Sequence, residues 1–246
     1  RLGLEAGLAL GDVNGDGLED VYLCQPGGLP NKLFLHQPDG TLLDRSAEAG
    51  VDFLDASRAA LLLDFDDDGD RDLVTSTAGR LLLLANDGDG RFWLQGALAA
   101  PEASSLAAAD IDLDGDLDLF TCGGASPYDH GPLPLPYQAA RDGTPDRMFE
   151  NHGECLFVEA GAEFGLEPDP AGYGSAACFE DIDLDGDPDL YVARDFGHGS
   201  LYRNDGGTFR RVGAASGVDG TSSALGASFG DADGDGLFDL CLSNRS

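Results

Sequence analysis

Basic residues are scarce in this chain. Its 246 residues include 14 Lys and Arg against 46 Asp and Glu, which gives a formal net charge of −32. A nucleic-acid-binding surface needs basic side chains opposite the phosphates, so this composition excludes nucleic acid as a partner. It also argues against binding to an anionic lipid surface. Lys32 is the single lysine, so arginine supplies nearly all of the positive charge.

Long hydrophobic runs and ordered cysteine patterns are also missing. No apolar run reaches the ~18 residues of a membrane-spanning helix, so no membrane insertion is predicted for this segment. The five cysteines are sparse and odd in number, and no Cys-x-x-Cys pair occurs. Neither a disulfide framework nor a zinc site is therefore predicted. Because 42% of the residues are hydrophobic, the chain is expected to fold rather than to form a disordered acidic tail.

The acidic residues recur as one nine-residue pattern in five copies, which are numbered here as loops 1 to 5. Every copy has a carboxylate or amide at places one, three and five, Gly at place six and Asp at place nine. The copies begin at Asp12, Asp64, Asp110, Asp181 and Asp231. Acidic turns that simply end strands would explain one copy, but not five with the same internal spacing.

This spacing matches the needs of Ca²⁺, which takes six to eight hard oxygen ligands in a tolerant geometry. A chain that curls round an ion turns alternate side chains inward, and Gly at place six permits a sharp turn with positive φ. Place seven then offers its carbonyl, and Asp at place nine closes the shell. Ca²⁺ is favoured over Mg²⁺, which usually keeps several waters. About five ions are expected, with loop 1 the weakest site because it has one carboxylate fewer.

The predicted ligands are side chains at places one, three, five and nine together with the carbonyl at place seven. They are Asp12, Asn14, Asp16, Leu18 and Asp20 in loop 1; Asp64, Asp66, Asp68, Asp70 and Asp72 in loop 2; Asp110, Asp112, Asp114, Asp116 and Asp118 in loop 3; Asp181, Asp183, Asp185, Asp187 and Asp189 in loop 4; and Asp231, Asp233, Asp235, Leu237 and Asp239 in loop 5.

The segments on either side of each loop predict strands, not the helices of an EF-hand. Short β-branched or aromatic runs follow place nine, at 21–24, 73–76, 119–122, 190–193 and 240–243. A second hairpin with an Asn, Asp or Gly centre follows most loops. One repeat is therefore four strands in ~40–50 residues, which is typical of a propeller blade.

The expected fold is all-β, a β-propeller with four-stranded blades. Four blades and half of a fifth are expected, and the chain is expected to be a fragment of a longer protein. The approximate bounds are 1–53, 54–102, 103–169, 170–220 and 221–246. A proline-rich insertion at 124–145 lengthens the third repeat. Within it, Tyr128, His130, Tyr137 and Arg141 form either the lip of a ligand site or part of a proline-stiffened cover.

The repeats resemble the FG-GAP/VCBS family of calcium-binding propeller repeats found in integrin α-chain heads. The stretch 172–204, with loop 4, Arg194-Asp-Phe-Gly197 and Leu201-Tyr-Arg-Asn204, is similar to bacterial ASPIC/UnbV-type relatives of cartilage acidic protein. Those proteins usually have Asn where Arg194 stands. The resemblance implies a seven-bladed propeller, integrin α N-terminal-like, that is secreted, periplasmic or on the cell surface and has no catalytic activity of its own.

Two classes of function remain open. The favoured hypothesis is a calcium-binding, non-catalytic binding or adhesion module with structural ions and a protein or glycan ligand. The alternative is a carbohydrate-active propeller, either a Ca²⁺-dependent lectin or a polysaccharide lyase. A lyase needs a basic residue beside its substrate, but Lys32 is alone and His36, His130, His152 and His198 fall in different turns. No His-Glu-x-x-His motif occurs.

Overall fold

A computed structural model describes residues 7–124, 143–153, 155–166, 172–220 and 223–244. The chain divides into two compact units: residues 1–103 with 152–157 form unit 1, and 104–151 with 158–246 form unit 2. The insertion residues Tyr128, His130, Tyr137 and Arg141 lie outside the described residues.

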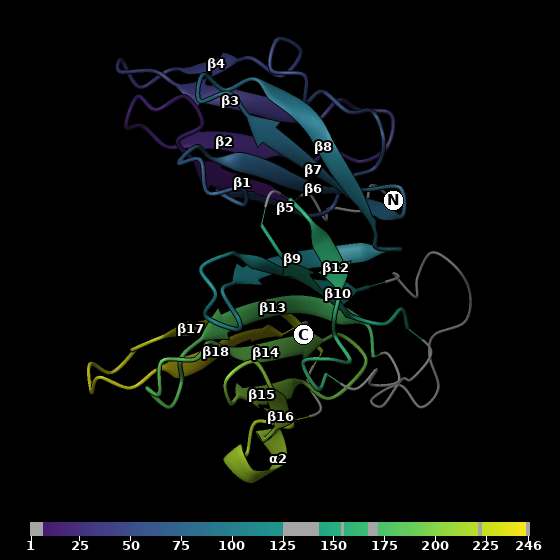
Figure 1. Cartoon of the computed structure of the whole chain (residues 1–246), viewed down its shortest axis with the longest axis vertical. Helices are drawn as coiled ribbons and strands as arrows, with labels where there is room; N and C mark the ends of the chain where they lie inside the picture. The colour runs from purple at the N-terminus through teal and green to yellow at the C-terminus, as the bar shows by residue number, and fades with distance from the viewer. Residues whose placement is uncertain (1–6, 125–142, 154, 167–171, 221–222, 245–246) are drawn as a thin grey trace. The chain divides into compact units, whose positions relative to one another are not determined.

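Unit 1 contains two four-stranded sheets (Figure 1). The first sheet consists of β1 (Leu8–Gly11), β2 (Asp20–Leu23), β3 (Lys32–His36) and β4 (Leu42–Asp44). The second consists of β5 (Ala60–Leu63), β6 (Asp72–Thr77), β7 (Arg80–Asn86) and β8 (Phe92–Ala99).

Three further sheets belong wholly or mostly to unit 2. The third sheet consists of β9 (Ala103–Ala109), β10 (Asp118–Gly123), β11 (Arg147–Asn151) and β12 (Phe157–Glu159). The fourth consists of β13 (Gly174–Glu180), β14 (Asp189–Arg194), β15 (Ser200–Asn204) and β16 (Phe209–Arg211). The fifth has two strands, β17 (Ala224–Gly230) and β18 (Asp239–Asn244).

Each strand lies beside the next strand in the chain, so every sheet is a simple meander without crossovers. In the first sheet, for example, β1 pairs antiparallel with β2, β2 with β3 and β3 with β4. This arrangement confirms the expected all-β fold of four-stranded, blade-like sheets. The one element of another kind in the described residues is the four-residue helix α2 (Gly213–Ser216), which the sequence did not predict. None of the described helices has the length and apolar character needed to cross a membrane.

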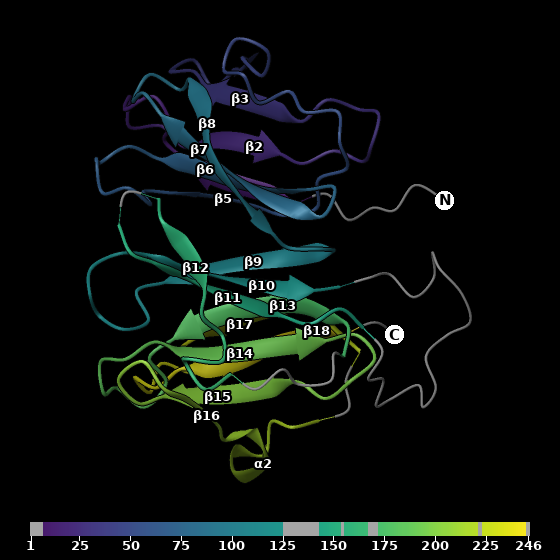
Figure 2. The same ribbon diagram turned by 45° about the vertical axis from the view of Figure 1, so that its right-hand side comes forward.

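Strands of neighbouring sheets contact each other within each unit. β1 contacts β5 in unit 1, and β13 contacts both β10 and β17 in unit 2 (Figure 2). A Cβ atom on Gly11 would lie 3.1 Å from the Cβ of Leu62. The small residue before loop 1 therefore allows β1 to approach β5 closely, as expected for the inner strands of a propeller.

The core of each unit is built from apolar side chains of neighbouring sheets. In unit 1, Tyr22 and Leu33 of the first sheet pack in one cluster with Leu73 and Leu84 of the second. All five cysteines carry free thiols. Burial raises the pKa of Cys24 to about 11, so this thiol stays protonated and unreactive at neutral pH.

The packing of the unit 1 core predicts that truncating two leucines of the second sheet has very different effects on the stability of the fold. Leu73 on β6 is 0% exposed, whereas Leu94 on β8 is 60% exposed. Leu73→Ala removes buried methyl groups and leaves a cavity, so we expect a loss of about 2–5 kcal/mol. Leu94→Ala, the matched control, should change stability by less than about 0.5 kcal/mol. Urea unfolding followed by circular dichroism measures both, and equal effects would contradict this packing.

Candidate metal centres

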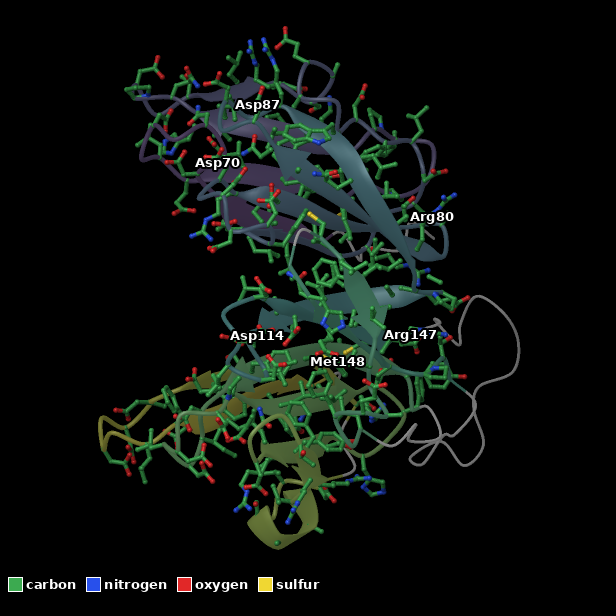
Figure 3. All side chains as sticks on the ribbon, viewed as in Figure 1. Asp70, Arg80, Asp87, Asp114, Arg147 and Met148 are labelled. Carbon is green, nitrogen blue, oxygen red and sulfur yellow. The ribbon has the colours of Figure 1, made fainter. Side chains whose placement is uncertain are left out.

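All five acidic loops have the same position in their sheets, between the first and the second strand. They therefore lie at one end of the strands in each unit. Figure 3 shows this for unit 1, where Asp70 of loop 2 and Asp87 lie at the end of the sheet opposite Arg80. In unit 2, Asp114 of loop 3 and Arg147 likewise lie at opposite ends of the third sheet.

The backbone winds through two left-handed residues in each loop. Glycine at place six has φ between 84° and 103° in the five copies, which confirms the expected sharp turn. Place four is left-handed as well, which the residue spacing did not predict. The residues there are Gly15, Asp67, Leu113, Leu184 and Gly234. Leucine is disfavoured in this conformation by contacts of its Cβ, so loops 3 and 4 hold strained backbone at the centre of the candidate site.

The place-one aspartate organises the turn by accepting backbone hydrogen bonds. Asp110 accepts from the N–H groups of Asp114 at 3.1 Å and Gly115 at 3.1 Å. Asp181 accepts in the same way from places five and six of loop 4, at 3.0 Å and 2.9 Å. The place-five carboxylate in turn accepts from the place-seven N–H in all five loops. These bonds hold the carboxylates in an inward-curving arc.

The arc brings carboxylate oxygens from one loop close together. Four loops each place three such oxygens within 4.8 Å of one another. Places one, three and nine provide them in loops 2, 4 and 5, whereas places one, three and five provide them in loop 3. In loop 1, Asn14 replaces one carboxylate, and its Nδ2 donates to Asp16 Oδ2 at 3.2 Å.

Loop 2 shows most directly that a cation suits these residues. Asp64 Oδ1 and Asp66 Oδ1 are both buried, and neither accepts a hydrogen bond from any described residue. Burial raises the pKa of Asp66, and the carboxylates of Asp68 and Asp64 raise it further. Buried anionic oxygens without donors are costly. An all-oxygen, carboxylate-rich set of this kind fits a hard divalent cation such as Ca²⁺.

The place-nine aspartate joins the loop to its sheet. In loop 2, Asp72 is buried, and it accepts from the N–H of Phe65 at 3.2 Å and from the N–H of Asn86 at 2.8 Å. The same two bonds, to place two and to the end of the third strand, occur in loops 1, 3 and 4. In loop 5, whose sheet has two strands, Asp239 is exposed and accepts from Ala232 alone among the described residues.

Burial also changes the acidity of these aspartates. It raises the pKa of Asp72 to about 7, and the pKa values of Asp118 and Asp189 to about 6. The two backbone donors oppose this rise, and the neighbouring loop carboxylates add to it. Without a cation, the charged form of the place-nine side chain is therefore unfavourable in the folded protein.

One recurrent residue of the site is not among the predicted ligands. An asparagine ends the third strand of the second, third and fourth sheets, at Asn86, Asn151 and Asn204. The hairpin interpretation assigned these residues to the turn alone. In the structure their backbone N–H groups donate to the place-nine carboxylates. The sequence signal for this role was an asparagine at the same place in three repeats.

The comparisons with known proteins agree with this geometry. A sequence profile of the FG-GAP-like repeat matches residues 64–121 and 181–242, which run from loop 2 through loop 3 and from loop 4 through loop 5. The chain carries FG-GAP-like repeats. The two matched segments contain four of the five acidic loops.

Curated relatives of these FG-GAP-like repeats are distant. Cartilage acidic protein 1 of Homo sapiens is 29% identical over 202 residues, and the Mus musculus protein is 28% identical over 200 residues. Each alignment covers 76% of this chain and 28% of the relative, so the chain corresponds to little more than a quarter of those proteins.

Two solved structures share the fold. The Vibrio cholerae biofilm matrix protein Bap1 superposes with a TM-score of 0.52 at 15% identity, covering 96% of this chain and 34% of that chain. An Agrocybe aegerita lectin is described by its specific recognition of non-reducing terminal N-acetylglucosamine. It superposes with a TM-score of 0.50 at 19% identity, covering 96% of this chain and 60% of the lectin chain. At these identities the likeness extends to the fold of the FG-GAP-like repeats alone.

The raised pKa values predict an unusual pH dependence for the metal-free protein. Asp72, Asp118 and Asp189 titrate near pH 6–7 when folded, but near their ordinary value of 3.8 when unfolded. Between these limits the folded chain binds more protons, so the stability should fall as the pH rises from about 4 to 7. Melts in EDTA across this range measure it. A stability that rises with pH in EDTA would contradict the burial of these three aspartates with only two backbone donors each.

Proposed function

We propose that this chain is a calcium-binding segment of a β-propeller that acts as a non-catalytic binding or adhesion module outside the cytoplasm. Each of the five loops holds one Ca²⁺ between two strands, and the ions are structural. The ligand is a protein or a glycan that binds the surface of the blades. The proposed location is secreted, periplasmic or at the cell surface.

The pair of donor-free buried oxygens on Asp64 and Asp66 carries the calcium proposal. When bound, Ca²⁺ supplies two positive charges and a flexible shell of six to eight oxygen contacts. The chain contributes the preformed part of the shell: place one is fixed by backbone donors and place nine by the sheet. Loops 3, 4 and 5 each place three carboxylate oxygens within 4.8 Å of one another as loop 2 does, although in loops 3 and 4 the place-five N–H donates to Oδ1 of the place-one aspartate. The same function therefore extends to the other copies.

Three observations support a binding role outside the cytoplasm. Calcium sites of extracellular modules work with dissociation constants of about 10⁻⁴–10⁻³ M, which suits exposed loops such as loop 5. The structurally similar Bap1 is named as a biofilm matrix protein. The strongly negative charge keeps isolated chains apart and selects against nucleic acid and anionic membranes as ligands.

The surroundings of Lys32 favour binding over lyase chemistry. Its Nζ donates to Asp44 Oδ2 at 2.7 Å. This hydrogen bond, together with those from Ser46, lowers the pKa of Asp44 to about 2. The ammonium group of Lys32 is therefore paired with a carboxylate of its own sheet. Among the described histidines, His36 ends β3, His152 follows β11 and His198 lies between β14 and β15.

Calcium titration tests the metal proposal. We expect the native chain to bind about five Ca²⁺ and to lose one site in Asp66→Ala. The matched control is Asp39→Ala, which changes an aspartate in the turn between β3 and β4 and should keep every site. Each site filled at 100 times its dissociation constant adds about 2.7 kcal/mol, against a typical domain stability of about 5–15 kcal/mol. EDTA should therefore lower the melting temperature sharply.

Equal stoichiometry in Asp66→Ala and the native chain would contradict binding at loop 2. An unchanged melting temperature in EDTA at constant ionic strength would contradict a structural role for the ions. Titration with Mg²⁺ in place of Ca²⁺ separates the two cations, and tighter binding of Mg²⁺ would overturn the choice of metal.

Ligand binding is tested on glycan and matrix-protein arrays, with Ca²⁺ present and after EDTA treatment. A structural ion predicts binding that decreases only under conditions in which the chain also melts or loosens. A lectin whose Ca²⁺ contacts the sugar predicts loss of binding in EDTA while the fold is retained, as judged by circular dichroism. No binding to either array in Ca²⁺ would count against the adhesion role and leave the metal proposal intact.

A further inference from the structure

Asn86 connects two candidate metal loops through one buried side chain. Its Nδ2 donates to the carbonyl of Val13 at 2.8 Å and to the carbonyl of Arg71 at 2.9 Å. Val13 is place two of loop 1, between two predicted ligands, and Arg71 is place eight of loop 2. The backbone N–H of Asn86 meanwhile donates to Asp72, at place nine of loop 2.

The same connection recurs in unit 2. Asn204 Nδ2 donates to the carbonyl of Ile111 at 2.9 Å and to the carbonyl of Pro188 at 3.3 Å. Ile111 is place two of loop 3, and Pro188 is place eight of loop 4. The backbone N–H of Asn204 donates to Asp189 at 2.7 Å. Two independent parts of the chain therefore link one loop to the next loop in the same way.

We propose that Asn86 and Asn204 couple neighbouring metal sites, so that Ca²⁺ at loop 1 raises the affinity of loop 2 and Ca²⁺ at loop 3 raises that of loop 4. This inference rests on the proposed calcium binding and adds to it that the affinity of one site depends on the occupancy of its neighbour. The two asparagines are positioning residues, because they hold the backbone of the loops and offer no ligand of their own.

The physical basis is shared ordering. A bound cation fixes places one and three of loop 1, and therefore the Val13 peptide between them. Asn86 is then held by a carbonyl that no longer moves, and its own N–H keeps the Asp72 carboxylate in place. Loop 2 has less conformational freedom left to lose when it binds its ion. Because such coupling is reciprocal, Ca²⁺ at loop 2 must favour loop 1 by the same factor.

Hydrogen exchange with mass spectrometry follows each loop separately while Ca²⁺ is added. The readout is the Ca²⁺ concentration that half-protects segment 64–72. Asp16→Ala disables loop 1 by removing an exposed place-five carboxylate. In the native background it should raise the midpoint for 64–72 by about fivefold or more. In the Asn86→Ala background the same substitution should leave that midpoint unchanged.

Asn31→Ala is the matched control. Asn31 lies in the connection between β2 and β3 and is as buried as Asn86, and its Nδ2 donates to Tyr22 Oη and Ser57 Oγ, both at 2.9 Å. It lies before β3, at the end of the sheet away from the loops. In this variant Asp16→Ala should still shift the midpoint for 64–72. Loss of the shift in both asparagine variants would mean that general loosening, and not the link, carries the effect.

Asn86→Asp gives a second test if Asn86→Ala does not fold, because it keeps the size of the side chain and removes the Nδ2 donor. Asn204→Ala with loops 3 and 4 provides a third. The coupling is overturned if Asp16→Ala leaves the midpoint for 64–72 unchanged in the native background. It is also overturned if Asp16→Ala still shifts that midpoint after the Asn86 donor has been removed. Absence of Ca²⁺-dependent protection at every loop would instead overturn the proposed calcium binding itself.

Discussion

The pair of backbone hydrogen bonds accepted by each buried place-nine aspartate is the interaction on which these blades depend. One bond closes the acidic loop at place two, and the other holds the end of the third strand. The same carboxylate faces the other acids of its loop. Burial makes its charge unfavourable, and two neutral donors do not fully compensate. The place-nine aspartate therefore both holds the sheet together and makes a bound cation favourable.

Neighbouring blades are joined at both ends of their strands by polar groups. At the loop end the links are the asparagine side chains of the third strands. At the other end of unit 2, Arg194 Nη1 lies 3.0 Å from Asp146 Oδ2 and also donates to the carbonyl of Gly172. This buried ion pair borders a cavity of about 470 Å³ between the third and fourth sheets. Arg194 thus has a structural role at the end of β14.

Much of the fold follows from the spacing of a few residue types. Glycine at place six, with a β-branched or aromatic run after place nine, predicted a turn between two strands five times, and the structure has a hairpin at each position. The candidate ligands could be chosen in advance because the loop is local: nine consecutive residues provide most of the oxygens. Carboxylates two residues apart converge whatever the rest of the chain does, since the turn alone directs them inward.

The sequence by itself determined the repeat, the strands and the acidic oxygens, because each depends on residues close together in the chain. Tertiary structure alone decided which oxygens are buried, how the place-nine pKa values rise, and which loops are linked. Asn86 looks like an ordinary turn residue until β7 is placed beside loop 1, 73 positions earlier in the chain. Burial and long-range hydrogen bonds arise only when blades pack, so no local pattern could specify them.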